Sequence, residues 1–254
     1  MNSLVKIILN IIPRSILTRL SFLLKPLIKI YLSGNKYVDP IDGSSFRKFL
    51  PYGYNNIREN ALSPSTFSLE RHRLLWLYLK NETDFFNKKL KVLHFAPEAA
   101  FLEKFKKLKN ISYDTIDLNS PLANIKADIC DLPLDDESYD FILCNHVLEH
   151  IIDDKKAMQE LYRVLKKDGI GIFQVPINMS NKKTYEDFTI IDPKERNKAF
   201  GQYDHVRIYG MDFFDRLEEA GFMVEKCEYT SKLNSEEIIK YCLPNREIIP
   251  ICRK

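Results

Sequence analysis

Residues 127–175 constrain the fold more than any other part of this chain. Phe141–Cys144 and Ile170–Val175 are two short apolar runs. The stretch between them, residues 154–165, has apolar side chains at helical spacing, namely Ala157, Met158, Leu161, Val164 and Leu165. A strand, a helix and a second strand in this order predict a βαβ unit, and with it a parallel sheet and a right-handed crossover.

Polar residues follow the first of these strands directly, namely Asn145, His146, Glu149 and His150. Open α/β sheets bind ligands at the carboxyl ends of their strands. We therefore expect a ligand site here. Two further strands are expected at residues 91–96 and 111–117, and the second ends in Asp117. An acid at such a strand end typically binds the ribose hydroxyls of a nucleotide-like ligand, although an Asx turn with Asn119 is the alternative.

Four short segments in this order resemble the core of class I S-adenosylmethionine-dependent methyltransferases of the type 11 kind. They are Asp128-Ile-Cys-Asp-Leu-Pro, Ser138-Tyr-Asp-Phe-Ile, His146-Val-Leu-Glu-His150 and Leu165-Lys-Lys-Asp-Gly. The resemblance extends more weakly over residues 68–254. It implies a Rossmann-like, seven-stranded α/β sheet, mostly parallel with its last strand antiparallel, and S-adenosyl-L-methionine as cofactor.

The resemblance also implies which residues contact the cofactor: Ala96, Pro97, Glu98, Asp117, Leu118, Asp128, Ile129, Asn145 and His146. Asp128 would accept from the adenine amino group, with Leu118 and Ile129 against the ring. Asn145 and His146 would border the methionine end.

The first strand-to-helix turn departs from the family, because it reads His94-Phe-Ala-Pro-Glu-Ala-Ala and has no glycine. Small Ala96 is expected to allow close approach of the ligand to the backbone. Pro97 suits a first helical turn. Glu98 has two interpretations: it accepts a hydrogen bond from the methionine ammonium, or it is a carboxylate stabilised at a helix N-terminus.

A long connection, residues 176–209, is expected to hang over the carboxyl edge of the sheet, and its aromatic content argues against disorder. His205 is the first candidate for a general base, and His150 for orienting the substrate or taking its proton. Substrate contacts are expected from Tyr203, Arg207 and Tyr209. The alternative is a lid fastened by an Asp204–Arg207 pair.

The segment His146–His150 also fits H-x-x-E-H, a zinc peptidase pattern. That pattern must lie within a helix and needs a third ligand downstream. Because the segment follows a buried strand directly, we disfavour the peptidase.

Residues 1–38 form a separate segment with six basic residues and no acidic ones. Its charge-free stretches are too short to span a bilayer. We expect two basic amphipathic helices, broken near Pro13 and Pro26, that lie on an anionic membrane. The alternative is a helical arm packed on the domain or on a second subunit.

Residues 39–67 have the spacing of a four-cysteine zinc ribbon without its sulfur ligands. The four positions are Asp39, Asp42, Ser63 and Thr66. The resemblance implies a ribbon that has lost its metal, and the simplest form of this segment is two turns that close a small hairpin. Aromatic side chains would replace the zinc, namely Phe46, Phe49, Tyr52 and Tyr54.

Five scattered cysteines and a net charge of +3 indicate a reducing, cytoplasmic compartment and give no support for nucleic acid as a partner. The expected function is methyl transfer to a small-molecule or glycan- or lipid-linked acceptor at oxygen, without a metal. The alternative is a non-catalytic binding or scaffold protein that kept the fold. The expected parts are residues 1–38, 39–67 and 68–254.

Overall fold

The structure is a computed structural model that describes residues 24–53 and 57–254. They form two compact units. The first contains the described residues up to Leu77 together with Leu233–Asn245, and the second contains Tyr78–Lys232 and Arg246–Lys254. The expected break near Pro13 and the arm before residue 24 lie outside the described residues, as does Tyr54.

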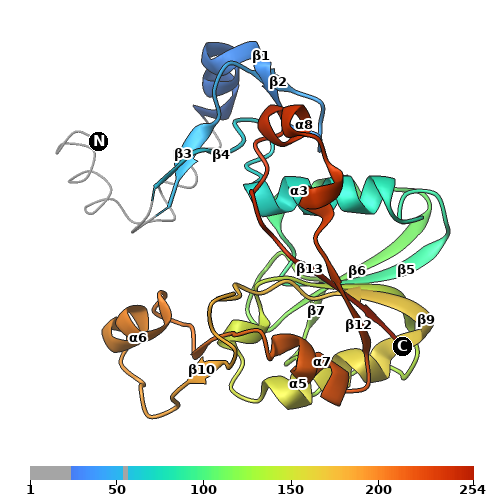
Figure 1. Cartoon of the computed structure of the whole chain (residues 1–254). Coiled ribbons are helices and arrows are strands. Elements are labelled where there is room, and N and C mark those ends of the chain that lie inside the picture. The colour runs from blue at the N-terminus through green and yellow to red at the C-terminus, as the bar shows by residue number, and fades with distance from the viewer. Residues whose placement is uncertain (1–23, 54–56) are drawn as a thin grey trace. The chain divides into compact units, whose positions relative to one another are not determined.

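The second unit is built on one seven-stranded sheet with the order β12-β13-β9-β8-β5-β6-β7 (Figure 1). Its strands are β5 (Leu90–Phe95), β6 (Ile111–Asp117), β7 (Ile125–Lys126), β8 (Tyr139–Cys144), β9 (Leu165–Ile172), β12 (Met223–Cys227) and β13 (Ile249–Arg253). The pairs β5–β6, β5–β8, β6–β7 and β8–β9 are parallel, whereas β13 is antiparallel to both β9 and β12. The predicted mostly parallel sheet with an antiparallel last strand is confirmed.

Helices cover this sheet because their apolar faces match it. The second unit contains α4 (Ala99–Phe105), α5 (Asp154–Val164) and α7 (Phe213–Glu219), and the short 3-10 turns η1 (Leu148–His150) and η2 (Tyr229–Lys232). The predicted apolar positions of α5 are fully buried in one core with residues of α7, and Figure 1 shows these two helices on the same face of the sheet. Asp153 caps α5 by accepting from the Lys156 amide.

The connection after β9 is more ordered than the sequence indicated. It contains α6 (Pro193–Phe200) and a two-stranded ribbon of β10 (Tyr185–Glu186) and β11 (Arg207–Ile208). The α6 helix begins with an Asp192 cap and Pro193 in its first turn, and ends at Gly201 with φ of 83°. These capping residues can be recognised in the sequence. Because only Phe200 of the helix is buried, the sequence has no apolar stripe that would predict the helix.

The first unit consists of short elements. Residues 24–32 are helical. β1 (Ser33–Val38) pairs with β2 (Ser45–Phe46), and β3 (Leu50–Tyr52) pairs with β4 (Arg58–Leu62). The unit also holds α8 (Ser235–Lys240) and the beginning of α3 (Glu70–Asn81). Pro26 lies in the first described turn of this helical stretch, and because the residues before Leu24 lie outside the described ones, the break expected near Pro26 stays a prediction.

A small aromatic core fills this unit. Phe46 and Phe49 are buried beside Leu32, with their ring centroids 5.8 Å apart. Tyr52, expected in the same cluster, is exposed. Of the three predicted aromatic residues that the structure describes here, Phe46 and Phe49 form the cluster.

A buried arginine explains why residues 233–245 belong to the first unit rather than to one domain spanning residues 68–254. The Arg73 guanidinium donates to the backbone oxygens of Ala61, Ser68, Tyr241 and Cys242 at 2.7–3.0 Å. Burial lowers the pKa of Arg73, and nearby acidic groups oppose that shift. An arginine in this position stabilises three chain segments at once, because each buried N–H requires an acceptor.

Hydroxyl groups of the second turn converge on the Asp39 carboxylate. Asp39 is fully buried, and its Oδ2 accepts from the hydroxyls of Thr66, Ser65 and Ser68 at 2.5, 3.4 and 3.2 Å. Asp42 accepts from the Ser65 hydroxyl at 3.2 Å. Hydrogen bonds between a carboxylate and hydroxyls thus close the turns at the ribbon positions. We name this arrangement the Asp39 cluster.

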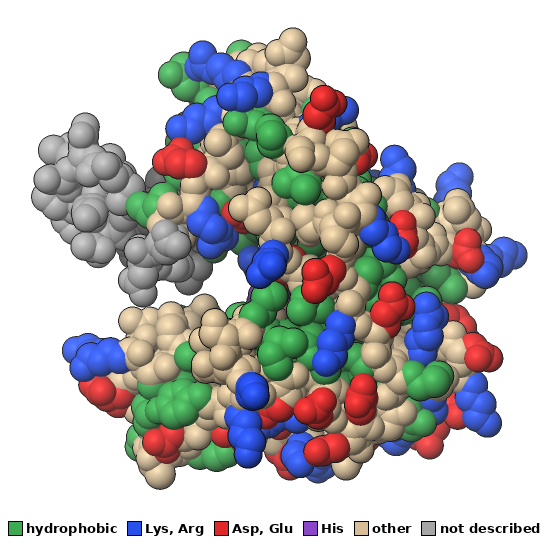
Figure 2. Space-filling model, viewed as in Figure 1, with side chains coloured by type: hydrophobic (Ala, Val, Ile, Leu, Met, Phe, Trp, Pro, Cys, Tyr) green, Lys and Arg blue, Asp and Glu red, His purple; other side chains and the backbone are tan. Residues whose placement is uncertain are grey.

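Two surface features of the described residues bear on partners. No helix among them combines the length and the apolar character needed to cross a bilayer. Figure 2 shows basic and acidic side chains interspersed on the face in view. This distribution fits the small net charge and shows no extended basic stripe on that face.

Candidate functional site

A pocket of about 480 Å³ lies at the carboxyl ends of β5 and β6 in the second unit. Ligand pockets typically measure ~300–1,000 Å³, so its size suits a cofactor. Six of the predicted cofactor residues line it, together with His150: Ala96, Asp117, Leu118, Asp128, Ile129 and His146. The sequence missed the other lining residues, which are Phe95, Ile116, Asn119, Ala127, Val147, Ile151 and Asp204. Pro97, Glu98 and Asn145 are not among its walls.

Two lining residues have unusual backbone conformations. Ala96 has φ of 44° and His146 has φ of 56°, both in the left-handed region. Side chains with a Cβ atom adopt this region at a cost, and such residues concentrate at functional sites. Ala96 therefore supplies, at the end of β5, the backbone conformation that glycine usually supplies, with only a methyl group added.

Asp117 takes part in the Asx turn that the sequence offered as the alternative to ribose binding. Its Oδ1 accepts from the amides of Asn119 and Ser120 at 2.7 and 2.6 Å. Within the described residues, Oδ2 makes no hydrogen bond, and Asp117 lines the pocket. The turn thus fixes the carboxylate and leaves one oxygen for a ligand, so the two interpretations are compatible.

Asp128, which also lines the pocket, is oriented in a similar way. Its Oδ1 accepts from the amide of Cys130 at 2.9 Å. The adjacent Ile129 side chain is buried and faces the same pocket. Together they present an acceptor beside an apolar surface.

Glu98 belongs to a buried polar network next to the pocket. Its Oε2 lies 3.1 Å from His94 Nε2 and accepts from Asn145 Nδ2 at 3.4 Å. His94 Nδ1 lies 2.7 Å from the Tyr113 hydroxyl. Burial raises the pKa of Tyr113, so its hydroxyl remains a donor. The chain of donors therefore runs from Tyr113 to His94 and from His94 Nε2–H to Glu98.

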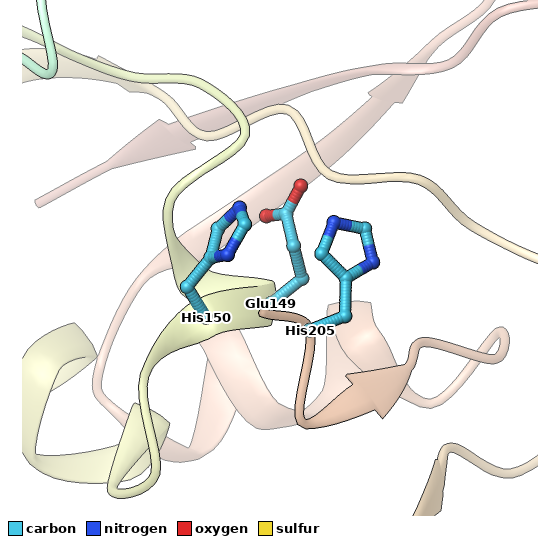
Figure 3. Close-up of side chains that lie close together, drawn as sticks. All are labelled: Glu149, His150 and His205. Carbon is cyan, nitrogen blue, oxygen red and sulfur yellow. The ribbon is translucent and has the colours of Figure 1, made fainter. Parts of the chain in front are cut away.

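The segment after β8 and the connection before β11 bring three side chains together beside the pocket. Glu149, His150 and His205 each offer a ligand atom, and these atoms lie within 4.8 Å of one another (Figure 3). The rings of His150 and His205 meet edge to face with centroids 4.7 Å apart. The structure thus places both predicted catalytic histidines in one cluster.

Burial and the neighbouring His146 set the charge states in this cluster. Burial lowers the pKa of His205, which favours the neutral imidazole. Burial alone would raise the pKa of Glu149, but the hydrogen bond and charge of His146 lower it overall. Glu149 Oε1 lies 3.3 Å from His146 Nδ1. Glu149 is therefore an ionised carboxylate beside a neutral base.

Several buried polar atoms around the pocket lack partners among the described residues. They are His146 Nε2, Glu149 Oε2 and Gln174 Nε2. Buried polar groups are nearly always hydrogen-bonded, so each one indicates a ligand or bound solvent. His146 Nε2 lies in a wall of the pocket and supports a cofactor there.

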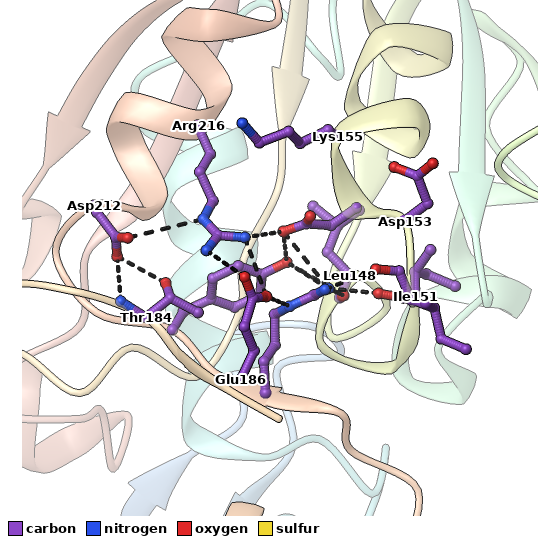
Figure 4. A network of polar contacts seen from close by, with 12 residues as sticks. Leu148, Ile151, Asp153, Lys155, Thr184, Glu186, Asp212 and Arg216 are labelled. Carbon is purple, nitrogen blue, oxygen red and sulfur yellow. Dashed lines mark hydrogen bonds and ion pairs between the residues drawn. The ribbon is translucent and has the colours of Figure 1, made fainter. Parts of the chain in front are cut away.

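Arg207 and Tyr209 do not line the pocket. Both are buried, and Figure 4 shows the network around them. Arg207 Nε donates to Glu186 at 2.9 Å, and Tyr209 donates to Asp154 at 2.8 Å. Arg216 pairs with both carboxylates at 3.0 Å. We propose that Arg207 and Tyr209 hold the connection in place, instead of the substrate contacts expected from the sequence.

The alternative Asp204–Arg207 pair is also replaced. Asp204 lies beside His150, whose Nδ1 is 3.2 Å from the Asp204 backbone oxygen. Tyr203 is exposed and lies outside the pocket walls. Of the expected substrate residues, Tyr203 alone remains accessible.

Known proteins resemble parts of this chain. Residues 84–173 match the family model described as a methyltransferase domain. An uncharacterized protein of Methanocaldococcus jannaschii is 29% identical over 39% of this chain and 46% of its own length. A demethylmenaquinone methyltransferase of Chlamydia caviae is 33% identical over 26% of this chain and 29% of its own length. The chain thus spans less than half of either curated relative.

A solved S-adenosylmethionine-dependent methyltransferase from Mesorhizobium loti superposes with a TM-score of 0.49 and 16% identity, covering 71% of this chain and 98% of that chain. The family match thus covers residues 84–173 of the seven-stranded unit, and the order and directions of the strands are those of a Rossmann-like methyltransferase sheet.

Proposed function

We propose that this protein transfers a methyl group from S-adenosyl-L-methionine to an oxygen of a small-molecule or glycan- or lipid-linked acceptor. The observation that carries the proposal is the pocket at the carboxyl ends of β5 and β6. It combines the fixed Asp117 carboxylate, the Asp128–Ile129 wall and an unpartnered His146 nitrogen. These groups match the ribose, adenine and methionine parts of the cofactor.

When bound, S-adenosylmethionine supplies an electrophilic methyl group on a sulfonium. Asp117 Oδ2 would accept from the ribose hydroxyls, because its other oxygen is engaged in the turn. Asp128 would accept from the adenine amino group, with Ile129 and Leu118 packed on the ring. The left-handed Ala96 would bring the backbone of the first turn close to the ligand.

His205 would act as the general base for a hydroxyl acceptor. A neutral imidazole is required to take a proton, and burial of His205 favours that form. His150, which lines the pocket and lies next to His205, would orient the acceptor. Methyl transfer depends mainly on positioning, so this proton step matters most for a hydroxyl and less for a carboxylate.

Contact with an anionic membrane is a further part of the proposal. In the helical residues 24–32, the side chains of Leu27, Ile30 and Tyr31 are 64%, 73% and 72% exposed. Lys25 and Lys29 accompany them in the same helix. Exposed apolar residues with flanking lysines suit an interfacial helix and would bring a lipid-linked acceptor near the enzyme.

Calorimetry with S-adenosylmethionine and with its demethylated product tests the proposal. Asp117→Asn is the sharpest variant, because asparagine can keep the Asx turn while losing the charge. We expect it to weaken binding by about 1–3 kcal/mol. Asp215→Asn, on the exposed side of α7, is the matched control and should bind as wild type does.

Two outcomes would argue against the proposal. If the wild-type protein binds neither compound, the pocket is not a cofactor site, and a scaffold role takes its place. If Asp117→Asn binds as tightly as Asp215→Asn, the ribose assignment is wrong.

A further inference from the structure

The cluster of Glu149, His150 and His205 contains more titratable groups than general-base catalysis requires. A base needs one imidazole, whereas here two imidazoles converge on one carboxylate (Figure 3). The two segments that supply them are distant in the sequence. They are joined by a hydrogen bond from the Val206 amide to the Glu149 backbone oxygen at 3.0 Å.

The carboxylate at the centre is incompletely satisfied. Glu149 is only 2% exposed, and its Oε2 has no hydrogen-bond partner within residues 24–53 and 57–254. Its other oxygen faces His146 at 3.3 Å. Burying a carboxylate oxygen without a partner is costly, so a cation at this point would offset a substantial penalty.

One of the two histidines is arranged as metal ligands usually are. His150 Nδ1 faces the Asp204 backbone oxygen at 3.2 Å. A carbonyl only accepts, so Nδ1 carries the proton and Nε2 keeps its lone pair. In metal sites, the second ring nitrogen of a ligating histidine typically donates to a carbonyl or carboxylate in this way.

We propose that Glu149, His150 and His205 form a binding site for one divalent transition-metal ion at the edge of the cofactor pocket. Two imidazoles and one carboxylate suit zinc, iron, manganese or cobalt, whereas magnesium prefers a shell of oxygen ligands. This proposal replaces the expectation of no metal, which was based on the missing ribbon thiolates and on the position of the H-x-x-E-H segment directly after a buried strand.

The position of the site indicates what a bound metal would do. His150 and Asp204 belong to the pocket wall, so a metal bound there would have its open positions toward the pocket. Three protein ligands leave room for at least one more, as in catalytic rather than structural sites. We infer that an oxygen of the methyl acceptor would occupy that position, a consequence that rests on the proposed function. With His205 bound to the metal, the ion would lower the pKa of the acceptor hydroxyl in place of His205 as general base.

Cobalt binding tests the site without any need for activity. The full-length protein is stripped with a chelator and titrated with Co²⁺, and the visible absorption of the ion is recorded. We expect saturation at one Co²⁺ per chain and no displacement by excess Mg²⁺. His150→Gln and His205→Gln should each weaken binding at least about 10–100-fold, the range found for losing only a supporting residue.

Matched controls identify the site. Glu149→Gln should lose the metal, whereas Glu219→Gln, an exposed carboxylate paired with Lys155, should bind normally. Asp42→Asn tests the ribbon positions and should also bind normally. Circular dichroism on each variant confirms that it is folded.

Three results would overturn the proposal: no saturable Co²⁺ binding by the wild type, binding that survives in Glu149→Gln and His205→Gln, or binding lost in Asp42→Asn. Because no cofactor is present in this titration, its failure leaves the calorimetric test of the methyltransferase untouched. Likewise, failure of the calorimetric test leaves the test of metal binding untouched.

Discussion

His94 and Glu98 face each other across the turn that follows β5, with His94 Nε2 3.1 Å from Glu98 Oε2. This contact bears on the two roles that the sequence offered for Glu98. The carboxylate is engaged with a fully buried imidazole and makes no side-chain cap to α4. Glu98 is also the N-cap residue of α4, so the geometry is compatible with both roles.

We predict that Glu98→Ala lowers the free energy of unfolding by about 1–3 kcal/mol, because it leaves His94 Nε2–H buried without an acceptor. Urea denaturation measures the loss, and Glu98→Gln should retain part of the stability. A variant of normal stability with weakened cofactor binding would instead assign Glu98 to the methionine ammonium.

The left-handed conformation of Ala96 makes a second prediction. Ala96→Gly should leave the free energy of unfolding unchanged or raise it by up to about 1 kcal/mol, because glycine adopts positive φ without strain. Ala99→Gly, at the start of α4 with an exposed side chain, is the control and should destabilise by up to about 1 kcal/mol. An equal loss of unfolding free energy in Ala96→Gly and Ala99→Gly would show that Ala96 is not strained.

The network under the connection predicts a pH dependence. Burial alone would raise the pKa of Glu186, but hydrogen bonds from Arg216 and Arg207 lower it below its ordinary 4.5. A carboxyl group with a depressed folded-state pKa stabilises the fold above its unfolded pKa, and this stabilisation is lost as the pH falls through the folded value. Glu186→Gln should therefore cost about 1–3 kcal/mol at pH 7.

Urea denaturation at successive pH values below 4.5 measures the free energy of unfolding. The difference in this free energy between Glu186→Gln and wild type should shrink as the pH falls. Glu219→Gln provides the comparison, because its pair with Lys155 is exposed and should contribute at most about 1 kcal/mol. A pH-independent difference at Glu186 would exclude the ion-pair explanation.

The Asp39 cluster predicts a designed metal site. Replacing Asp39, Asp42, Ser63 and Thr66 together by cysteine should let the chain bind one additional zinc per molecule, because these positions have the spacing of a structural zinc ribbon. Elemental analysis, with Glu149→Gln added to remove the other proposed site, measures it. No zinc uptake by the folded variant would refute the ribbon interpretation.

The sheet was predictable because buried strands and an amphipathic helix carry strong periodic signals. The expected helix at residues 154–165 is observed as α5 (Asp154–Val164), and the second strand, β6, has the expected bounds. The α6 helix was missed because it buries almost nothing, so its stability comes from caps rather than from a stripe.

Side-chain roles in the long connection were harder to foresee. Arg207 looks the same in a sequence whether it binds a substrate or a buried carboxylate, and only the fold brings Glu186 beside it. The metal-ligating cluster was hidden for the same reason. Glu149 and His150 were visible in one motif, but the third ligand, His205, arrives from another segment.

The Asp39 cluster has a consequence for how the first unit assembles. A zinc ribbon folds only where metal is supplied and its thiols stay reduced, so chelation or oxidation dissolves it. Hydroxyls and a carboxylate are already in their working forms at neutral pH and undergo neither fate. The turns at Asp39 and Thr66 can therefore close as soon as the chain is synthesised, whatever the zinc supply and redox state of the surrounding compartment.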